Sequence, residues 1–482
     1  MPETGSPTAS ADVAIVGAGV VGSTLALALH RHLIEPGARI LLVDPRRAPA
    51  WQPINDTAAG LRTVAITPAS QKFLASLGVW ERLPQGAITA FPTLFAYGRS
   101  AQEKITFDAA DCVGRLSTEP PALGYIVEET ALLETLHRCL ERVAGEKEPT
   151  GNASGRDGTS SVSGSICWSR ACFDTLTWPA SHPWAQLHLS EAEHPPSAVA
   201  ASLVIAADGA RSKVRHQTEL TWIGRSYHQR AVVAIVENRE PNLVAIQRFL
   251  PRGPLAILPM GQHGMYSNIV WSTNESEADW LETGASASQF LDATHAALHR
   301  VNVDGGQHAP YRRFLSQNSY PIDRRSFPVV PSFQRLIPSR TDGRDRWSFP
   351  LHFGSATGYD ANRVVLVGDA AHVVHPLAGQ GVNLGLADAQ TLARVLKQAW
   401  QTGRDIGDPS VLAVYTRERL PLNTAMLVTL SALRRVFAFP TRTRGLGSTL
   451  ASSFRGLGMQ FIERVAPLRS SVVRIATGEP WL

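Results

Sequence analysis

The stretch 12–44 restricts the fold of this 482-residue chain more than any other part of the sequence. An apolar run is followed at once by Gly17, Gly19 and Gly22 in GxGxxG spacing, then by a helical pattern and a second apolar run that ends at Asp44. This order is typical of a βαβ unit whose turn approaches a pyrophosphate and whose second strand ends at a ribose-binding acid. We therefore expect a dinucleotide-binding site here. The alternative is a tight strand–helix turn without a ligand.

Two later apolar runs end in the same way. One leads to Asp208 and Gly209, and the other leads to Gly368 and Asp369. Ligands of open α/β sheets bind at the carboxyl ends of parallel strands. The sequence therefore predicts that these two acids and Asp44 share one edge of a sheet.

The residues after Asp369 combine a tight loop with the start of a helix. Leu384, Leu392 and Leu396 recur at helical spacing beyond the loop. A helix N-terminus presents free N–H groups and a positive dipole end, which suit an electron-rich ring or an oxyanion. The loop residues that we assign to such a site are Pro376, Gly379, Gln380, Gly381, Val382 and Asn383.

A cation precedes another capped helix. Thr67-Pro68 is typical of an N-cap followed by proline at the first helical position. Arg62 lies just before it and can reach a phosphate, although an ordinary surface cation fits the pattern as well.

Composition excludes several classes of protein. No uninterrupted apolar run reaches 18 residues, so no transmembrane helix is expected. The net charge of +5 is modest for this length, and no nucleic-acid-binding signature accompanies it. The four cysteines form no CxxC pair, so no metal site is expected. The N-terminus carries no signal or transit pattern, although a mitochondrial homologue whose leader had been removed would look the same.

The middle and the end of the chain differ in character. Residues 227–272 alternate as β-strands, whereas 145–165 are Gly/Ser-rich and 166–196 look like a surface insertion. From Leu427 onward the sequence has a helical, amphipathic pattern and contains eight arginines but only two glutamates. Such an end suits an anionic membrane surface, a protein partner or a solvated face.

Together, the GxGxxG turn, the Asp208-Gly209 strand end and the segment from Gly368 to Asn383 resemble the single-component FAD-dependent aromatic hydroxylases related to p-hydroxybenzoate hydroxylase. Within that superfamily the chain most resembles the ubiquinone-biosynthesis hydroxylases, the UbiH/UbiF/VisC group and the mitochondrial coenzyme Q monooxygenase. The stretches that carry this likeness are 62–70, 123–128, 227–229, 247–251, 253–259, 270–272 and 349–351, with Tyr415 and Arg417. The chain departs from the common pattern of this family at two positions. Asp44 stands where glutamate is common, and Glu129 stands where asparagine is common.

The resemblance implies an α/β fold with a Rossmann-like, GR2-type FAD-binding domain, an inserted mixed or antiparallel β-sheet substrate domain and a helical C-terminal region. The FAD-binding domain is expected over 10–85, 125–226 and 345–410, with 145–200 as a flexible insertion. The substrate domain is expected over 86–124 and 227–344, and the basic helical region over 411–482.

The resemblance also implies the roles of the site residues. Gly17, Gly19 and Gly22 would admit the pyrophosphate and Asp44 the adenosine ribose, with Arg62 at a phosphate. Asp208, Gly209 and Gly368 belong to the same cofactor site, and Asp369 would bind the ribityl chain. The loop from Pro376 to Asn383 would lie along the isoalloxazine.

The expected reaction is ring hydroxylation through a flavin carbon-4a hydroperoxide, with O₂ as co-substrate and NAD(P)H or a ferredoxin-type protein as reductant. The hydroperoxide must be kept from water, so we expect an apolar wall that includes Phe249, Leu258 and Trp271. No catalytic base stands out. His372, His375 and Tyr227 are weak candidates. A histidine beside a strand end is more often a packing or loop-fixing residue, and the alternative for Tyr227 is a buried, hydrogen-bonded core tyrosine.

The function expected from the resemblance is hydroxylation of a polyprenylated phenol in ubiquinone biosynthesis. Residues 349–351, with Ala356, Tyr359 and Arg363, resemble members that act at ring carbon 5. The alternatives are a hydroxylase of another aromatic metabolite and a flavin-binding scaffold in a quinone-synthesis complex. We expect peripheral contact with the cytoplasmic face of a bacterial inner membrane or the matrix side of the mitochondrial inner membrane. Other ubiquinone-synthesis proteins are possible partners, and neither nucleic acid nor metal is expected.

Overall fold

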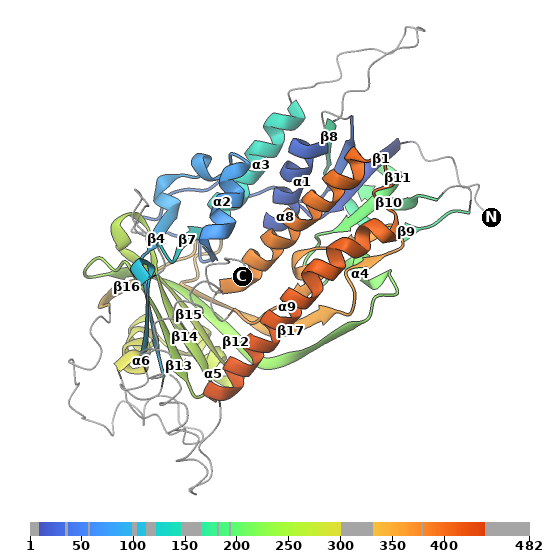
Figure 1. Ribbon diagram of the computed structural model, residues 1–482. Helices are drawn as coiled ribbons and strands as arrows, with labels where there is room; N and C mark the ends of the chain where they lie inside the picture. The colour runs from blue at the N-terminus through green and yellow to red at the C-terminus, as the bar shows by residue number, and fades with distance from the viewer. Residues whose placement is uncertain are drawn as a thin grey trace, which may run out of the picture.

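Parallel strands from distant parts of the sequence pair to form the first sheet (Figure 1). In the computed structural model the described residues are 9–33, 37–55, 58–98, 104–111, 122–145, 165–180, 183–191, 194–299, 331–376 and 379–438. Within them the first sheet has eight strands. Its order is β18 (Asp360–Ala361), β19 (Val364–Leu366), β11 (His194–Ala206), β1 (Ala9–Val16), β2 (Arg39–Val43) and β8 (Ser165–Ser169), with β10 (Ala185–Glu191) on β11 and β9 (Cys172–Thr177) on β10.

The pairs from β19 through β11, β1 and β2 to β8 are all parallel. Their apolar runs are buried, as expected for strands covered on both faces. One face is covered by α1 (Val20–Leu33), α3 (Glu129–Gly145) and α8 (Gln380–Gln401), with α1 in contact with both of the others (Figure 1).

The segment predicted as a flexible insertion contributes to this sheet. Strand β8 extends it beside β2, and β9 and β10 form an antiparallel extension on β11. The prediction was therefore wrong for the strands after residue 164, whose inward side chains such as Phe173 and Leu187 are buried. Residues 146–164 lie outside the described part of the chain.

The second sheet has nine strands in the described residues and is largely antiparallel. Its order is β20 (His372–Val373), β17 (Arg346–Ala356), β12 (Trp222–Asn238), β15 (Tyr266–Asn274), β14 (Gly253–Met260), β13 (Val244–Leu250), β5 (Thr93–Tyr97) and β6 (Lys104–Asp108), with β16 (Phe333–Ile337) beside β12. One face packs against α5 (Glu275–Asp279), the π-helical turn η5 (Trp280–Gly284) and α6 (Ala287–His299).

Two predicted domain boundaries differ from these sheets. Residues 346–356 form β17, which pairs with β12, so they belong to the second sheet and not to the cofactor-binding one. Strand β4 (Ile88–Phe91) lies in a separate three-stranded sheet with β3 (Thr63–Ile66) and β7 (Gly124–Glu128). This small sheet contacts both α8 and β14, and so it joins the two larger sheets.

The C-terminal helix α9 (Pro409–Ala438) packs against α8 and reaches β13 of the second sheet (Figure 1). The predicted α/β fold with an inserted β-sheet domain and a helical C-terminal region is confirmed; residues 439–482 lie outside the described part. The remaining short elements are α2 (Pro68–Ser76), α4 (Lys213–His216), η1 (Trp80–Arg82), η2 (Gln85–Ala87), η3 (Ala109–Asp111), η4 (Gln262–Gly264) and η6 (Gly368–Ala370).

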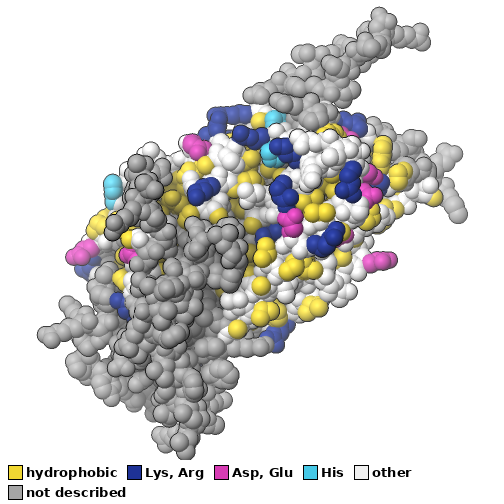
Figure 2. All heavy atoms as spheres, in the orientation of Figure 1, with side chains coloured by type: hydrophobic (Ala, Val, Ile, Leu, Met, Phe, Trp, Pro, Cys, Tyr) yellow, Lys and Arg dark blue, Asp and Glu magenta, His cyan; other side chains and the backbone are white. Residues whose placement is uncertain are grey.

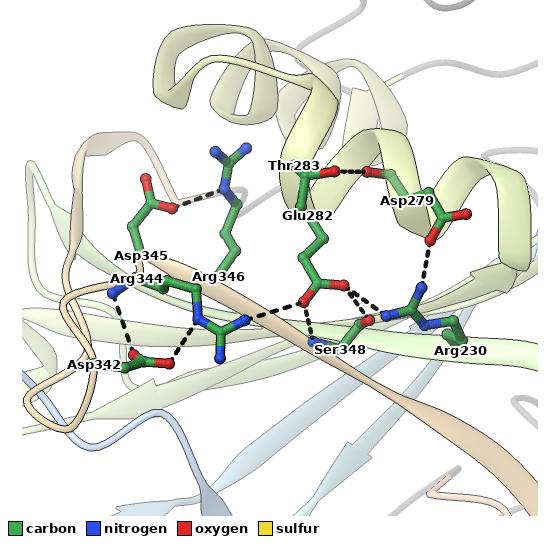
Figure 3. Close-up of polar contacts among 9 residues, drawn as sticks. All are labelled: Arg230, Asp279, Glu282, Thr283, Asp342, Arg344, Asp345, Arg346 and Ser348. Atoms are coloured by element: carbon green, nitrogen blue, oxygen red, sulfur yellow. Dashed lines mark hydrogen bonds and ion pairs between the residues drawn. The ribbon is translucent and has the colours of Figure 1, made fainter.

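A polar network fastens α5 and η5 to the second sheet (Figure 3). Glu282 accepts hydrogen bonds from Arg230 on β12, at 2.7 Å, and from the backbone of Ser348 on β17, at 3.3 Å. Arg230 also pairs with Asp279. One carboxylate thus ties three elements together on the face away from the predicted cofactor site.

Candidate functional site

The three sequence motifs meet at one edge of the first sheet. A Cβ on Gly17 would lie 2.4 Å from the carbonyl oxygen of Ala207, directly before Asp208. A Cβ on Gly368 would lie 3.2 Å from the side chain of Val21. The glycine turn therefore contacts both other motifs, and the predicted convergence of the three strand ends is observed.

The three glycines of the turn serve different purposes. Gly17 has φ +107°, and a side chain there would collide with β11. A Cβ on Gly22 would lie 2.0 Å from the Gly17 carbonyl oxygen, so this glycine lets α1 pack closely. A Cβ on Gly19 would meet nothing within 4 Å. Of the three, only Gly19 faces open space, where a ligand could approach the backbone.

Asp44 holds the glycine turn from the end of β2. Its buried carboxylate accepts the Ala18 N–H at 2.9 Å and a two-pronged pair from Arg46, at 3.1 and 3.0 Å. Burial alone would raise the Asp44 pKa, but the bonds from Arg46 and Ala18 outweigh it, and the net shift is downward. The Arg46 side chain is 78% exposed, so it can leave this carboxylate readily.

Asp208 and Gly209 form the second strand end. Burial raises the pKa of Asp208, whose Oδ2 accepts the Val214 N–H at 3.2 Å. Within the described residues its Oδ1 has no hydrogen-bond partner. Gly209 has φ +83°, and a side chain there would meet nothing within 4 Å. This strand end therefore combines a buried carboxylate oxygen at Asp208 with open space at Gly209.

Asp369 is exposed to solvent but is also surrounded by protein. Its side chain is accessible to solvent, yet enclosure by the protein raises its pKa, with His372 and Arg62 acting against that rise. Arg62 is therefore close enough to Asp369 to affect it. The Arg62 Nε lies 2.8 Å from Oε2 of Glu129. Arg62 therefore already forms an ion pair, which it would have to leave to bind a phosphate.

Helix α8 begins at this site without a side-chain cap. Its N-cap is Gly379, with φ +62°, which has no side chain to bond the first turn. Asn383 is used internally, because its Nδ2 donates to the Ala65 carbonyl at 2.7 Å and its Oδ1 accepts the Thr67 N–H at 2.9 Å. Asn383 thus fixes the loop against β3 and the start of α2.

The other predicted loop residues surround this helix start. Pro376 is half-buried and Gln380 is buried, on either side of 377–378, which lie outside the described residues. Gly381 and Val382 lie in the first turn of α8, where a Cβ on Gly381 would make only an ordinary contact with Val374.

His372 is a structural residue and not a free base. Its Nε2 lies 2.6 Å from Oδ2 of Asp388 on α8. Asp388 also accepts from the Gly368 N–H at 3.1 Å, from Arg419 Nε at 2.7 Å and from Asn423 at 3.0 Å. Asp388 and Arg419 were not predicted from the sequence. The available signal was an acid within the apolar stripe of a helix, four residues from both Leu384 and Leu392.

His375 and Tyr227 contact each other. Their rings are edge to face, with centroids 5.1 Å apart, and both side chains are buried. Tyr227 packs with Leu351 and the partly buried Phe349 on the second sheet. The two candidates therefore lie together where the loop after Asp369 meets the sheet.

The predicted apolar wall is only partly assembled. Phe249 lies in one cluster with Val374 of the site loop and with α9. Leu258 packs against a second cluster, as does Ala65, which lies beside Gly379. Trp271 faces the other way, because it lies in the cluster with Phe290 on the α6 side. Alternation along an antiparallel sheet explains this difference, since Val270 takes the site-facing position. We therefore remove Trp271 from the wall.

The residues present fit a flavin dinucleotide. The open Gly19 turn at the start of α1 suits a pyrophosphate, and Asp44 lies at the position of a ribose ligand. Asp369, whose side chain is accessible to solvent, adds an acceptor for hydroxyl groups. Within the described residues, no group of three or more His, Cys, Asp or Glu could hold a metal ion.

Comparison with known proteins agrees with this geometry. The FAD binding domain family matches residues 338–429. The crystal structure of p-nitrophenol 4-monooxygenase PnpA from Pseudomonas putida superimposes with a TM-score of 0.64 at 16% identity, covering 99% of this chain and all of that one, so the fold is shared. Fold, site and matches define an FAD-dependent monooxygenase.

More similar sequences identify the family. Human ubiquinone biosynthesis monooxygenase COQ6, a mitochondrial protein, is 32% identical over 485 residues, which span 97% of this chain and 92% of COQ6. Ubiquinone hydroxylase UbiL of Rhodospirillum rubrum is also 32% identical over 485 residues, spanning 99% of this chain and 92% of UbiL. The chain belongs to the ubiquinone biosynthesis monooxygenase family.

Proposed function

We propose that this chain uses FAD to hydroxylate the aromatic ring of a polyprenylated phenol in ubiquinone biosynthesis. The observation that carries the proposal is the convergence of Gly19, Asp208 and Asp369 at one sheet edge, beside the start of α8. The substrate class follows from the names of the two relatives that span nearly the whole chain.

The protein's own groups would hold each part of FAD. Asp44 would bind the adenosine ribose after exchange with the exposed Arg46, and the Gly19 turn would bind the pyrophosphate. Asp369 would bind the ribityl hydroxyls. The N-terminus of α8 would lie beside the ring, where its dipole stabilises negative charge on the reduced form.

When bound and reduced by NAD(P)H or a ferredoxin-type protein, FAD supplies the activation of O₂ that ring hydroxylation needs. The protein supplies positioning and a dry surface. Phe249 and Leu258 present apolar side chains next to the site loop, suited to a prenylated ring. Tyr227 and His375, which pack on each other where the site loop meets the second sheet, are polar groups that could hold a proton from the phenol.

Peripheral membrane contact is part of the proposal. In the described residues no helix is long and apolar enough to cross a membrane. Leu422 and Val428 on α9 are 51% and 62% exposed, and Figure 2 shows apolar side chains among arginines and lysines on the face of α8 and α9. A bacterial inner membrane or the matrix side of the mitochondrial one fits the origins of the relatives. Cosedimentation with anionic but not neutral vesicles would test this contact.

The ring position rests on the resemblance of residues 349–351 to members that act at carbon 5, and we propose that position. Phe349 and Leu351 pack beside Tyr227, so they are placed to influence how the ring lies. Other ubiquinone-synthesis proteins remain proposed partners.

The deciding experiment combines purified protein with FAD, reductant, O₂ and a prenylated phenol, followed by mass and NMR analysis of the product. We expect addition of one oxygen, at carbon 5. Hydroxylation elsewhere would reject only the ring position. FAD binding without product from this phenol would reject the proposed substrate, and product from another aromatic would support the alternative hydroxylase. FAD binding without turnover of any phenol would favour the scaffold. Unchanged ubiquinone after gene deletion, with no accumulated precursor, would reject a role in ubiquinone biosynthesis.

A further inference from the structure

We propose that His137, on α3, is a positioning residue for the cofactor, because its neutral imidazole directs the Gly19 N–H toward the pyrophosphate site. The inference rests on the proposed FAD binding and assigns a role to a buried side chain that the mechanism above does not use. It also gives a purpose to β8, whose Trp168 packs on this imidazole.

Both ring nitrogens of His137 form hydrogen bonds, and the two partners determine which nitrogen carries the ring proton. Nδ1 lies 3.1 Å from the Ala48 nitrogen, and a backbone N–H can only donate. Nδ1 must therefore be the bare acceptor, and the ring proton must be on Nε2. Nε2 lies 2.8 Å from the Ala18 carbonyl oxygen and donates to it. The geometry thus selects one neutral tautomer.

The contact with Ala18 completes the anchoring of one peptide in the glycine turn. The Ala18 N–H donates to Asp44 at 2.9 Å, and its carbonyl accepts from Ser23 Oγ at 2.9 Å as well as from His137. In a trans peptide the carbonyl and the next N–H point in opposite directions. Holding the Ala18 carbonyl toward His137 therefore turns the Gly19 N–H away from α3.

The surroundings favour the neutral ring. Burial is the largest cause that lowers the His137 pKa, and Arg170, from the turn after β8, lowers it further. The Ala18 carbonyl, Asp44 at the end of β2 and Glu141 on α3 act in the opposite direction but do not outweigh burial. Trp168 packs edge to face on the ring at 4.5 Å and adds no charge.

Protonation would break the arrangement on one side. An imidazolium carries N–H on both nitrogens, so its Nδ1–H would oppose the Ala48 N–H. The ring would have to turn or withdraw, and the Ala18 carbonyl would lose its fixed direction. FAD affinity should therefore fall when His137 takes up a proton, at a pH below the ordinary value of 6.5.

The test measures FAD dissociation constants of the apoprotein by flavin fluorescence, at about pH 7.5 and about pH 5.5. His137→Ala should bind FAD about tenfold more weakly at the higher pH. His137→Gln keeps a donor near Nε2 and does not titrate, so it should bind nearly as well as wild type at the higher pH and lose less affinity in acid. His188→Ala is the matched control, since His188 bonds Thr177 on the β9–β10 pair, away from the turn.

The outcomes separate this inference from the proposed function. Wild-type protein that binds no FAD at either pH overturns both. Wild type and His137→Ala with equal affinity overturn the role of His137 alone, as does an acid loss of the same size in wild type and His137→Gln. If His137→Ala does not fold, the comparison of wild type with His137→Gln across pH still decides the question.

Discussion

His372 Nε2 lies 2.6 Å from Asp388 Oδ2, and neither side chain has any exposed surface. The same carboxylate accepts from the Gly368 N–H and from Arg419, so the turn that carries Asp369 is held by α8 and α9 together. Burial alone would raise the Asp388 pKa, but His372, Arg419 and Asn423 outweigh it, and the net shift is downward. The stabilisation from this carboxylate is therefore present above the ordinary aspartate pKa of 3.8 and is lost as pH falls through the lowered value.

Asp388→Asn should be strongly destabilising, because it leaves Arg419 buried opposite a neutral group. Breaking a buried pair costs about 3–5 kcal/mol, and FAD affinity should fall as the Gly368 turn loosens. Urea unfolding at neutral pH and flavin fluorescence measure the two effects. The control is Asp405→Asn, which removes an ion pair with Arg363. The Asp405 side chain is 45% exposed, so the free energy of unfolding should fall by less than about 1 kcal/mol. Equal stability of the two variants would contradict this account.

Two glycines of the same turn should respond oppositely to alanine. Gly19→Ala adds a methyl group to open space, so the fold should survive while FAD affinity falls about tenfold or more as the methyl occupies the approach to the backbone. Gly17→Ala adds it at φ +107° against the Ala207 carbonyl oxygen, which should destabilise the fold itself. Thermal unfolding of the apoproteins and FAD titration separate the two. A Gly19→Ala protein that binds FAD normally would remove the turn from the proposed site.

Glu128 should make stability depend on pH near neutrality. Burial raises its pKa from 4.5 to about 7, and Trp51 and Arg340 offset only part of that rise. A raised pKa means that the stabilisation is complete below pH 4.5 and is lost as pH rises through about 7. Glu128→Gln should therefore be more stable than wild type above pH 7, by up to about 3 kcal/mol. Urea unfolding of both proteins across this range checks it, and parallel pH curves would show that Glu128 does not titrate there.

Asp369→Ala should lose FAD and keep its fold. The carboxylate is accessible to solvent and carries no packing that the fold requires, so the free energy of unfolding should change by less than about 1 kcal/mol. Affinity for FAD should fall about tenfold or more as a hydroxyl acceptor disappears. Calorimetry of the apoprotein and FAD titration give both values. Full retention of FAD would count against the assignment of Asp369, with Asp369→Asn showing whether charge or hydrogen bonding matters.

The strand ends were predictable from sequence because each signal is local. A buried apolar run that stops at an acid and a glycine indicates the edge of a parallel sheet, and Asp44, Asp208 and Asp369 all lie there. Strand β8 was not predictable in this way, since its pairing with β2 joins segments more than 100 residues apart. Its polar and aromatic composition resembles a surface excursion.

Side-chain partners were the least predictable part of the site. Asn383 was expected to face the flavin, yet its oxygen accepts from Thr67, which lies 316 residues away in the chain. Trp271 was expected in the wall, but Val270 and Trp271 are both apolar, so alternation could not show which of them faces the site. Such choices depend on tertiary packing and not on a local pattern.

Glu282 should matter for stability and not for the cofactor. It joins Arg230 and Ser348 on the face of the second sheet opposite the site loop (Figure 3), and only 9% of its side chain is exposed. Glu282→Gln keeps the shape but removes the charge that faces Arg230, so we expect a loss of about 1–3 kcal/mol. FAD affinity should stay at the wild-type value, because the network contacts none of the proposed FAD-binding residues. Urea unfolding and FAD titration of this variant provide the comparison, and weakened FAD binding in a folded Glu282→Gln protein would mean that the two sheets are more tightly coupled than their contacts indicate.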